Sequence, residues 1–379
     1  MTDLAFTAPL AALDRPLEAV RRFTPNWFAA TMGTGILAIA LSQLPGAGPV
    51  LRQAAEALWL LNIGLFALFT ALYGARWILF PHEAKQVFGH PVMSMYLGCI
   101  PMGLATIVNG FLIFGRARWG QGAVEFASAL WLVDVALSLA CGLVIPYAMY
   151  TRQQHAIEQM TAVWLLPVVA AEVAAVSGGM IAPLLPDAGQ RLGALVASYA
   201  LWGYSVPAAL SILAILILRM ALHKLPPAAM AASSWLALGP IGTGALGLLV
   251  LGAAAPQVLT GPLSAYGEAA RAGGLIAALL LWGYGLWWMG LAVAITLKHL
   301  REKLPFNLGW WGYTFPLGVF SVTTLRLGAV LPVPALEEAG VVLVVALAAI
   351  WLVVAGRTLA GAWRGELFVA PCLAEPKQP

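Results

Sequence analysis

Long apolar stretches alternate with short polar linkers along the whole chain. A helix needs about 20 apolar residues to cross a bilayer, and about ten stretches reach that length. They fall near residues 23–44, 54–79, 91–114, 123–150, 161–181, 190–218, 230–254, 268–297, 307–330 and 336–356. The linkers are rich in Pro, Gly and charge and leave no room for a soluble domain. The pattern predicts an all-α integral membrane protein with ten transmembrane helices.

Composition and charge support a membrane location and set the orientation. Of the 379 residues, 61% are hydrophobic and only 9% are charged, whereas soluble proteins carry roughly a quarter charged residues. When alternate linkers are counted, 14 of the 20 Lys and Arg residues lie on the side of the N-terminus. Basic residues favour the cytoplasmic side. We therefore expect a protein of the cell (plasma) membrane with a cytoplasmic segment 1–22, a transmembrane domain 23–360 and a cytoplasmic tail 361–379.

An internal repeat organises these stretches into pairs. Every even-numbered stretch carries one tryptophan in a similar context, and the spacings between successive copies are 72, 71, 80 and 69 residues. These residues are Trp59, Trp131, Trp202, Trp282 and Trp351. Such a period indicates a repeated supersecondary unit, here a helical hairpin used five times. Five parallel copies about an axis along the membrane normal predict quasi-fivefold symmetry around a central pore.

The odd-numbered stretches share an aromatic residue followed by a helix breaker. Tyr96, Trp235 and Trp311 each precede a proline by five residues, and Trp164 precedes Pro167 by three. The first stretch has Met32 in place of the proline. A proline inside a helix frees a carbonyl group, which is tolerated in a membrane where it faces protein or water. We therefore place the odd helices on the pore and expect these lining residues: Gly33, Thr34, Gly35, Pro101, Gly103, Thr106, Pro167, Glu172, Pro240, Gly242, Thr243 and Gly318.

Two acidic residues stand near the middle of predicted spans, and no Lys or Arg lies at a comparable depth. Polar groups at membrane depth suggest function. Glu172 is either a titratable group that tunes anion passage or a protonated residue bonded to a neighbouring helix. Asp134, on an outer helix, is either a packing residue or part of a transport path. Without a basic side chain, helix N-termini and hydroxyl groups would have to attract an anion.

The densest aromatic cluster lies in the ninth stretch, over residues 309–318. A bulky apolar ring beside a bend can close a pore by excluding water. Phe315, held by the neighbouring Pro316, and Phe320 are the two candidates for such a gate. Ordinary packing is the alternative for both.

Other classes of function find less support in the sequence. The five histidines are predicted on cytoplasmic loops or helix ends, and the three cysteines have no metal-binding spacing. We therefore expect no metal, no cofactor and no enzyme site. The basic pI near 9.0 follows from the orientation bias and requires no nucleic-acid partner. A receptor or scaffold would leave the recurring prolines without a use.

Several motifs resemble one known family, the tellurite-resistance/dicarboxylate transporters, whose members include fungal sulfite efflux pumps, yeast malate permeases and plant slow anion channels. The similarity rests on three segments: Phe23-Thr24-Pro25-Asn26-Trp27-Phe28 with Met32-Gly33-Thr34-Gly35, Leu130-Trp131-Leu132-Val133-Asp134, and Trp310-Trp311-Gly312-Tyr313-Thr314-Phe315-Pro316. The resemblance implies five hairpins with the odd helices inside, a homotrimer, and a pore plugged by Phe315.

The resemblance also bears on the substrate. It implies a channel or transporter for a small anion, with sulfite efflux as the first expectation. C4-dicarboxylates such as malate, and tellurite-linked anion transport, stay open as alternatives. A dicarboxylate site would be expected to contain a buried Arg or Lys, which the sequence does not suggest.

Overall fold

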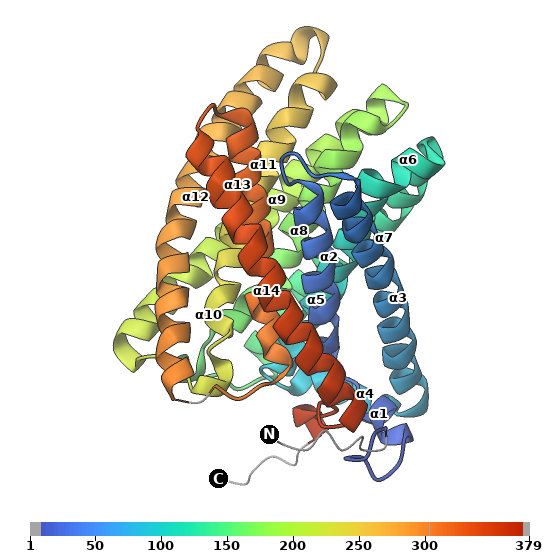
Figure 1. The fold of residues 1–379 in the computed structure, drawn as a ribbon, viewed down its shortest axis with the longest axis vertical. Coiled ribbons are helices and arrows are strands. Elements are labelled where there is room, and N and C mark those ends of the chain that lie inside the picture. The colour runs from blue at the N-terminus through green and yellow to red at the C-terminus, as the bar shows by residue number, and fades with distance from the viewer. Residues whose placement is uncertain (1–8, 303, 374–379) are drawn as a thin grey trace.

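The computed structural model describes residues 9–302 and 304–373, and within these ranges it holds helices and no strand. Five helices have 31 to 38 residues and lie on the outside. Five shorter ones, of 12 to 21 residues, lie inside; Figure 1 shows their arrangement. The outer helices are α3 (Pro49–Leu79), α7 (Gln121–Thr151), α9 (Ala188–His223), α12 (Ser264–Arg301) and α14 (Pro334–Arg364). The inner helices are α2 (Ala29–Ser42), α5 (Cys99–Gly110), α8 (Leu166–Ile181), α11 (Leu238–Val258) and α13 (Phe315–Val330). Four short helices complete the set: α1 (Leu17–Arg21), α4 (Pro81–Lys85), α6 (Arg116–Trp119) and α10 (Ser233–Leu236).

The all-α prediction is confirmed, whereas the predicted number of ten spans stays a prediction. Eight helical stretches of the described chain are long and apolar enough to cross a membrane. The two inner helices α2 and α13 have only 14 and 16 residues. Each continues a 3-10 helix, η1 (Pro25–Phe28) before α2 and η10 (Leu308–Tyr313) before α13.

The inner helices pack in a closed ring, in the order α2, α5, α8, α11, α13 and back to α2. We call this set of five helices the inner ring. Each outer helix fills the gap between the inner helix before it and the inner helix after it, and α14 fills the last gap, between α13 and α2. Burial follows this arrangement: 94% of the most apolar window of the stretch containing α8 is buried, against 22% for α7. The inner ring is therefore shielded from the surroundings.

The repeated tryptophans of the outer helices make the same contact five times. Each indole Nε1 donates a hydrogen bond to the inner helix that follows it around the ring. The bonds are Trp59 to Ile107 O (3.3 Å), Trp131 to Ala174 O (2.8 Å), Trp202 to Gly244 O (2.9 Å), Trp282 to Thr324 Oγ1 (3.0 Å) and Trp351 to Thr34 Oγ1 (3.1 Å). The last bond joins the final outer helix to the first inner helix. The sequence repeat therefore corresponds to a structural device that links neighbouring hairpins and closes the ring.

The recurring prolines stand at the starts of inner helices; 3-10 helix precedes three of these helices, and the short helix α10 precedes α11. Pro101 is the third residue of α5 and follows η3 (Met93–Gly98). Pro167 and Pro316 are second in their helices, and Pro240 is third in α11. The first-turn amides of an α-helix have no intrahelical partner, so a proline there costs no α-helical hydrogen bond. The sequence led us to expect prolines that bend helix interiors; in the structure they mark helix starts.

Helices α1 and α4 and the C-terminal end of α14 lie together at one end of the molecule (Figure 1). Buried arginines brace the loops there. Arg76 of α3 donates to Phe23 O (3.0 Å) and lies fully buried. Arg219, in the same position of α9, donates to the carbonyl oxygens of Lys224 and Glu158. The predicted terminal segments lie at this end, except for residues 1–8 and 374–379, which are outside the described chain.

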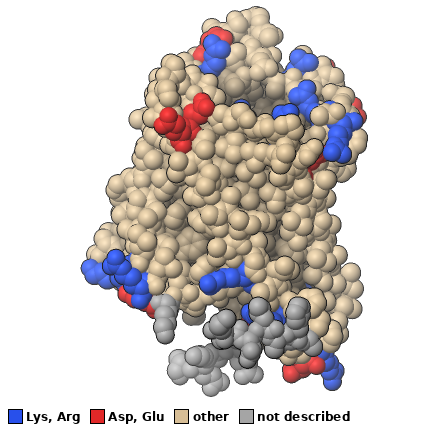
Figure 2. Space-filling model, in the orientation of Figure 1, with Lys and Arg blue, Asp and Glu red and all other residues tan. Residues whose placement is uncertain are grey.

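The outer surface is apolar over the middle of the molecule. In the face shown in Figure 2, Lys, Arg, Asp and Glu gather at the two ends, and other residues cover the band between them. Large side chains of the outer helices are exposed there, among them Leu132, Leu280 and Leu352 at 65–72% of their surface. Such a band suits contact with hydrocarbon.

Candidate functional site

A cavity of about 40 Å³ lies on the axis of the inner ring. We call it the axial cavity. Besides Phe315, its wall consists of three residues from each inner-ring segment, at spacings of three and four: Ile36, Ile39 and Gln43; Thr106, Asn109 and Ile113; Val173, Val176 and Met180; Thr243, Leu246 and Val250; Val319, Val322 and Arg326. Residues three and seven apart share one helix face. Because the five triplets follow one rule, the wall is built as three tiers of five side chains.

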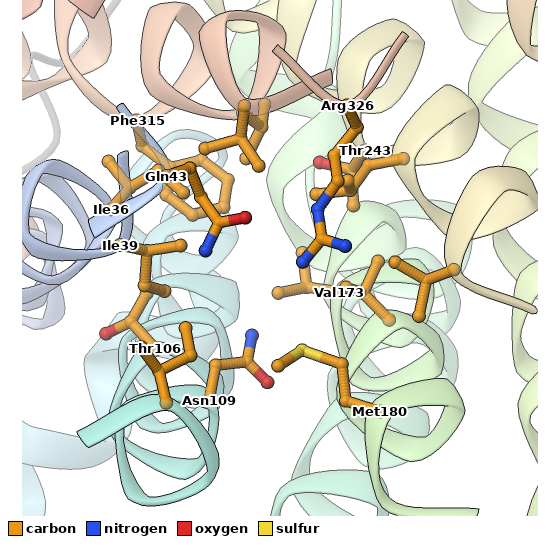
Figure 3. Close-up of a pocket in the computed structure, with 16 residues that line it drawn as sticks. Ile36, Ile39, Gln43, Thr106, Asn109, Val173, Met180, Thr243, Phe315 and Arg326 are labelled. Carbon is orange, nitrogen blue, oxygen red and sulfur yellow. The ribbon is translucent and has the colours of Figure 1, made fainter. Parts of the chain in front are cut away.

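The polar groups of the wall become stronger hydrogen-bonding groups with distance from Phe315. The first tier has two hydroxyl groups, from Thr106 and Thr243. The second has the amide of Asn109, and the third has the amide of Gln43 and the guanidinium of Arg326. Figure 3 shows the Gln43, Asn109 and Arg326 side chains pointing toward one another across the cavity.

Several of these groups have no partner within the described chain. The Thr243 hydroxyl and the Asn109 Oδ1 atom are buried without a hydrogen bond. Thr106 differs, because its hydroxyl donates to Gly103 O (2.7 Å) and accepts from Asn62 Nδ2 (2.9 Å). Buried polar groups are normally paired with protein or water. The free groups of the wall are therefore suited to a solute or to water in the path.

Arg326 is the basic residue that the sequence analysis missed. In the sequence analysis, Arg326 was counted among the basic residues on the side of the membrane opposite the N-terminus. No buried basic side chain was expected on the path. In the structure Arg326 lines both the axial cavity and a second, open pocket of about 270 Å³ at the end away from the termini. We call that pocket the distal vestibule; Arg116 and Gln257 also line it. The signal was the helical phase, since residue 326 lies eleven after Phe315 and shares its helix face.

Phe315 stands between the axial cavity and a smaller one of about 20 Å³ at the opposite end. We call the smaller one the basal chamber. Phe315 lines both and is only 3% exposed. Met32, Cys99 and Pro316 also line the basal chamber, and no charged side chain of the described chain does so. The aromatic ring is therefore placed to interrupt the axis.

The second candidate for a gate, Phe320, lies elsewhere. Its ring stacks on Trp282, with centroids 6.3 Å apart, and covers Gly285 of α12. It is completely buried and is absent from the walls of both cavities. The structure thus separates the two phenylalanines: one faces the axis, the other packs between helices.

Of the residues expected on the pore, Thr106 and Thr243 line the axial cavity. The glycines of the set lie instead where helices approach each other. A Cβ atom would meet the side chains of Thr314 at Gly33, Thr106 at Gly35, Thr31 at Gly103 and Ile36 at Gly318, and the backbone of Phe320 at Gly242.

The remaining expected residues face neighbouring helices or loops. Thr34 accepts the hydrogen bond from Trp351. The three prolines Pro101, Pro167 and Pro240 are buried at helix starts and do not appear in the cavity wall. Small residues at such contacts allow membrane helices to pack closely.

The two acidic residues also lie away from the axis. Glu172 is fully buried on α8; its Oε2 accepts a hydrogen bond from Ser205 Oγ of α9 (3.3 Å), and its Oε1 has no partner. Asp134 is fully buried on α7 with neither carboxyl oxygen bonded to a described residue. No Asp or Glu of the described chain lines the axial cavity. A negatively charged solute on the axis would meet donors and apolar groups.

Residues 9–302 and 304–373 contain no group of three or more His, Cys, Asp or Glu side chains placed to bind a metal ion. The arrangement is that of a conduit: two cavities on one axis, separated by an aromatic ring.

Comparison with known proteins agrees with this geometry. A sulfite efflux pump of Trichophyton rubrum is 39% identical over 355 residues, covering 92% of this chain and 93% of the relative. A malic acid transport protein of Schizosaccharomyces pombe is 23% identical over 346 residues, covering 88% and 77%. An uncharacterized transporter of Methanocaldococcus jannaschii is 29% identical over 360 residues, covering 95% and 99%. The profile of the voltage-dependent anion channel family matches residues 22–359. The chain belongs to the voltage-dependent anion channel family of membrane anion transporters.

Proposed function

We propose that this protein carries sulfite out of the cell along the axis of the inner ring. The observation that carries the proposal is the pair of axial cavities separated by Phe315. In this account α2 and α13 also span the membrane, so that ten helices form five hairpins in quasi-fivefold symmetry. The closed ring of contacts and the five tryptophan bonds support that arrangement.

The substrate assignment follows the more similar relatives. Three sulfite efflux pumps are 38–39% identical to this chain. Two others are 23–24% identical, and the malic acid transporter is 23% identical. Malate is the second candidate, and one observation favours it: Arg326 on the axial cavity provides the basic group that a carboxylate would pair with.

In the proposed path an anion enters the basal chamber, passes Phe315 and leaves through the three tiers of the axial cavity. The ring of Phe315 closes the path while it lies across the axis, because a narrow apolar constriction excludes water. Weak and distributed donors beyond it, such as the Thr243 hydroxyl, permit release. Pro316, at the start of α13, fixes the backbone next to the gate.

The proposal also covers the membrane, the orientation of the termini and the oligomeric state. We place it in the cell membrane with both termini in the cytoplasm, on the strength of the basic residues counted on that side. We also propose a homotrimer, as the family resemblance implies. Chemical crosslinking in native membranes tests the trimer, and a protease added to sealed cells tests the location of the termini.

Transport is tested with the purified protein in liposomes. Efflux of sulfite, malate, nitrate and chloride is measured separately under matched gradients, with empty liposomes as the control. The proposal predicts sulfite flux above that of malate. Malate flux above sulfite flux would favour the second candidate, and no flux of any of these anions would refute the transport function.

A further inference from the structure

The guanidinium of Arg326 is the one charged group of the described chain in the wall of the axial cavity. It lies at the junction of the axial cavity and the distal vestibule, since it lines both. No hydrogen bond or ion pair joins it to a described residue, whereas Arg118, on the same end of the molecule, is paired with Glu56 at 2.8 Å. Buried charges are normally paired, so a partly buried basic group without a counter-ion is available to bind a solute.

Neutral donors accompany this charge. Asn109, in the second tier, is only 7% exposed, and its amide Nδ2 donates to no residue of the described chain. The Thr243 hydroxyl, in the first tier, is 1% exposed and likewise unpaired. Gln43 and Arg326 approach Asn109 across the cavity in Figure 3. A guanidinium fork, two amides and a hydroxyl together can donate to several oxygen atoms of one small anion.

The site lies on one side of Phe315 only. The basal chamber has no charged side chain within the described chain, so an anion on that side meets no comparable group. The distal vestibule adds a second guanidinium, Arg116, at the open end. An anion can therefore reach Arg326 from the distal side while Phe315 still closes the axis.

We propose that Arg326, Asn109 and Gln43 form a binding site for a small oxyanion on the distal side of the Phe315 gate. The ligand is a compact anion with two or more oxygen atoms, such as sulfite, held by the two parallel N–H groups of the guanidinium and by the amides. A monatomic anion cannot accept both ends of the fork in the same way. This inference rests on the proposed anion path and gives it a selective site.

The test measures binding rather than transport. Sulfite is titrated calorimetrically into the detergent-purified protein, and chloride is titrated as the monatomic comparison. The variants are Arg326→Gln, Arg326→Lys and, as the matched control, Arg118→Gln. A charge-assisted hydrogen-bonding pair contributes enough that its loss weakens binding by roughly tenfold or more. We expect that loss for Arg326→Gln, a smaller loss for Arg326→Lys, and affinity equal to the wild type for Arg118→Gln.

Thermal unfolding with and without sulfite supplies a second readout, because a ligand that binds the folded state raises the melting temperature. Sulfite should raise it for the wild type and for Arg118→Gln and leave it unchanged for Arg326→Gln, which also shows whether that variant is folded. Absence of sulfite binding by the wild type, or equal binding by folded Arg326→Gln, would overturn the proposed site. Since no membrane is needed, binding that persists in a protein without flux would refute the transport function and leave this site standing.

Discussion

A close backbone contact in the inner ring supplies a quantitative prediction. Gly98, the last residue of η3 directly before α5, faces the backbone of α8. A Cβ atom at this position would lie 2.2 Å from Leu166 O and 2.7 Å from Leu166 C. Ordinary van der Waals contact begins at 3.4 Å, so Gly98→Ala requires a separation of 3.4 − 2.2 = 1.2 Å. The obstacle is a carbonyl group of the backbone and cannot rotate away.

Overpacking of this kind costs about 1–3 kcal/mol, while replacing a helical glycine by alanine gains about 0.5–1 kcal/mol. We therefore expect Gly98→Ala to lower the free energy of unfolding by about 1–2 kcal/mol. The assay is equilibrium unfolding in detergent micelles, followed by circular dichroism. Gly203→Ala on α9 is the control, because nothing lies within 4 Å of its Cβ position; it should be as stable as the wild type or more stable. Stability of Gly98→Ala equal to that of Gly203→Ala would show that α5 and α8 do not pack this closely.

Three further predictions concern the ring, its brace and the buried acid. Trp351→Phe and Thr34→Val each remove one partner of the bond that closes the ring, so a double-mutant cycle in the same unfolding assay should give a coupling of about 0.5–1.5 kcal/mol; additive effects would contradict the bond. Arg76→Met leaves Phe23 O without its buried donor and should cost about 1–3 kcal/mol of unfolding free energy, and a variant as stable as the wild type would exclude this brace. Glu172→Gln keeps an acceptor for Ser205 and lies off the axis, so its anion flux in liposomes should follow the wild type from about pH 5 to pH 8; a changed pH profile would return this acid to the path.

Periodicity was enough to predict an all-α fold and a recurring role for the tryptophans. The tryptophan repeat in the even-numbered stretches recurs as five equivalent hydrogen bonds, from Trp59 through Trp351. A repeat of this kind is readable because each copy of the residue makes the same contact. The starts of the short inner helices are harder to predict. Hydropathy does not distinguish the 3-10 segment η10 from α13, because both are apolar.

The wall of the path could be predicted only in part, because nearly every side of an inner helix is buried. Glycine, threonine and proline at these positions serve either the cavity or the neighbouring helix, and composition does not distinguish the two. Thr34 and Thr243 illustrate this: one accepts a bond from Trp351, the other faces the axis. The wall residues follow a spacing of three and four along each inner helix. This spacing identifies them only when one residue of that helix is already known to face the axis. Phe315 was such a residue, and counting onward from it reaches Arg326.

The central claim is that anions pass along the axis and that Phe315 closes it. The most direct measurement compares sulfite flux through liposomes containing the wild type, Phe315→Ala or Phe320→Ala. Both variants remove a buried phenylalanine ring from α13, but only residue 315 borders the two axial cavities. The account predicts that flux rises in Phe315→Ala and stays near the wild-type value in folded Phe320→Ala. Equal flux in the wild type and Phe315→Ala, or a rise in both variants alike, would contradict it.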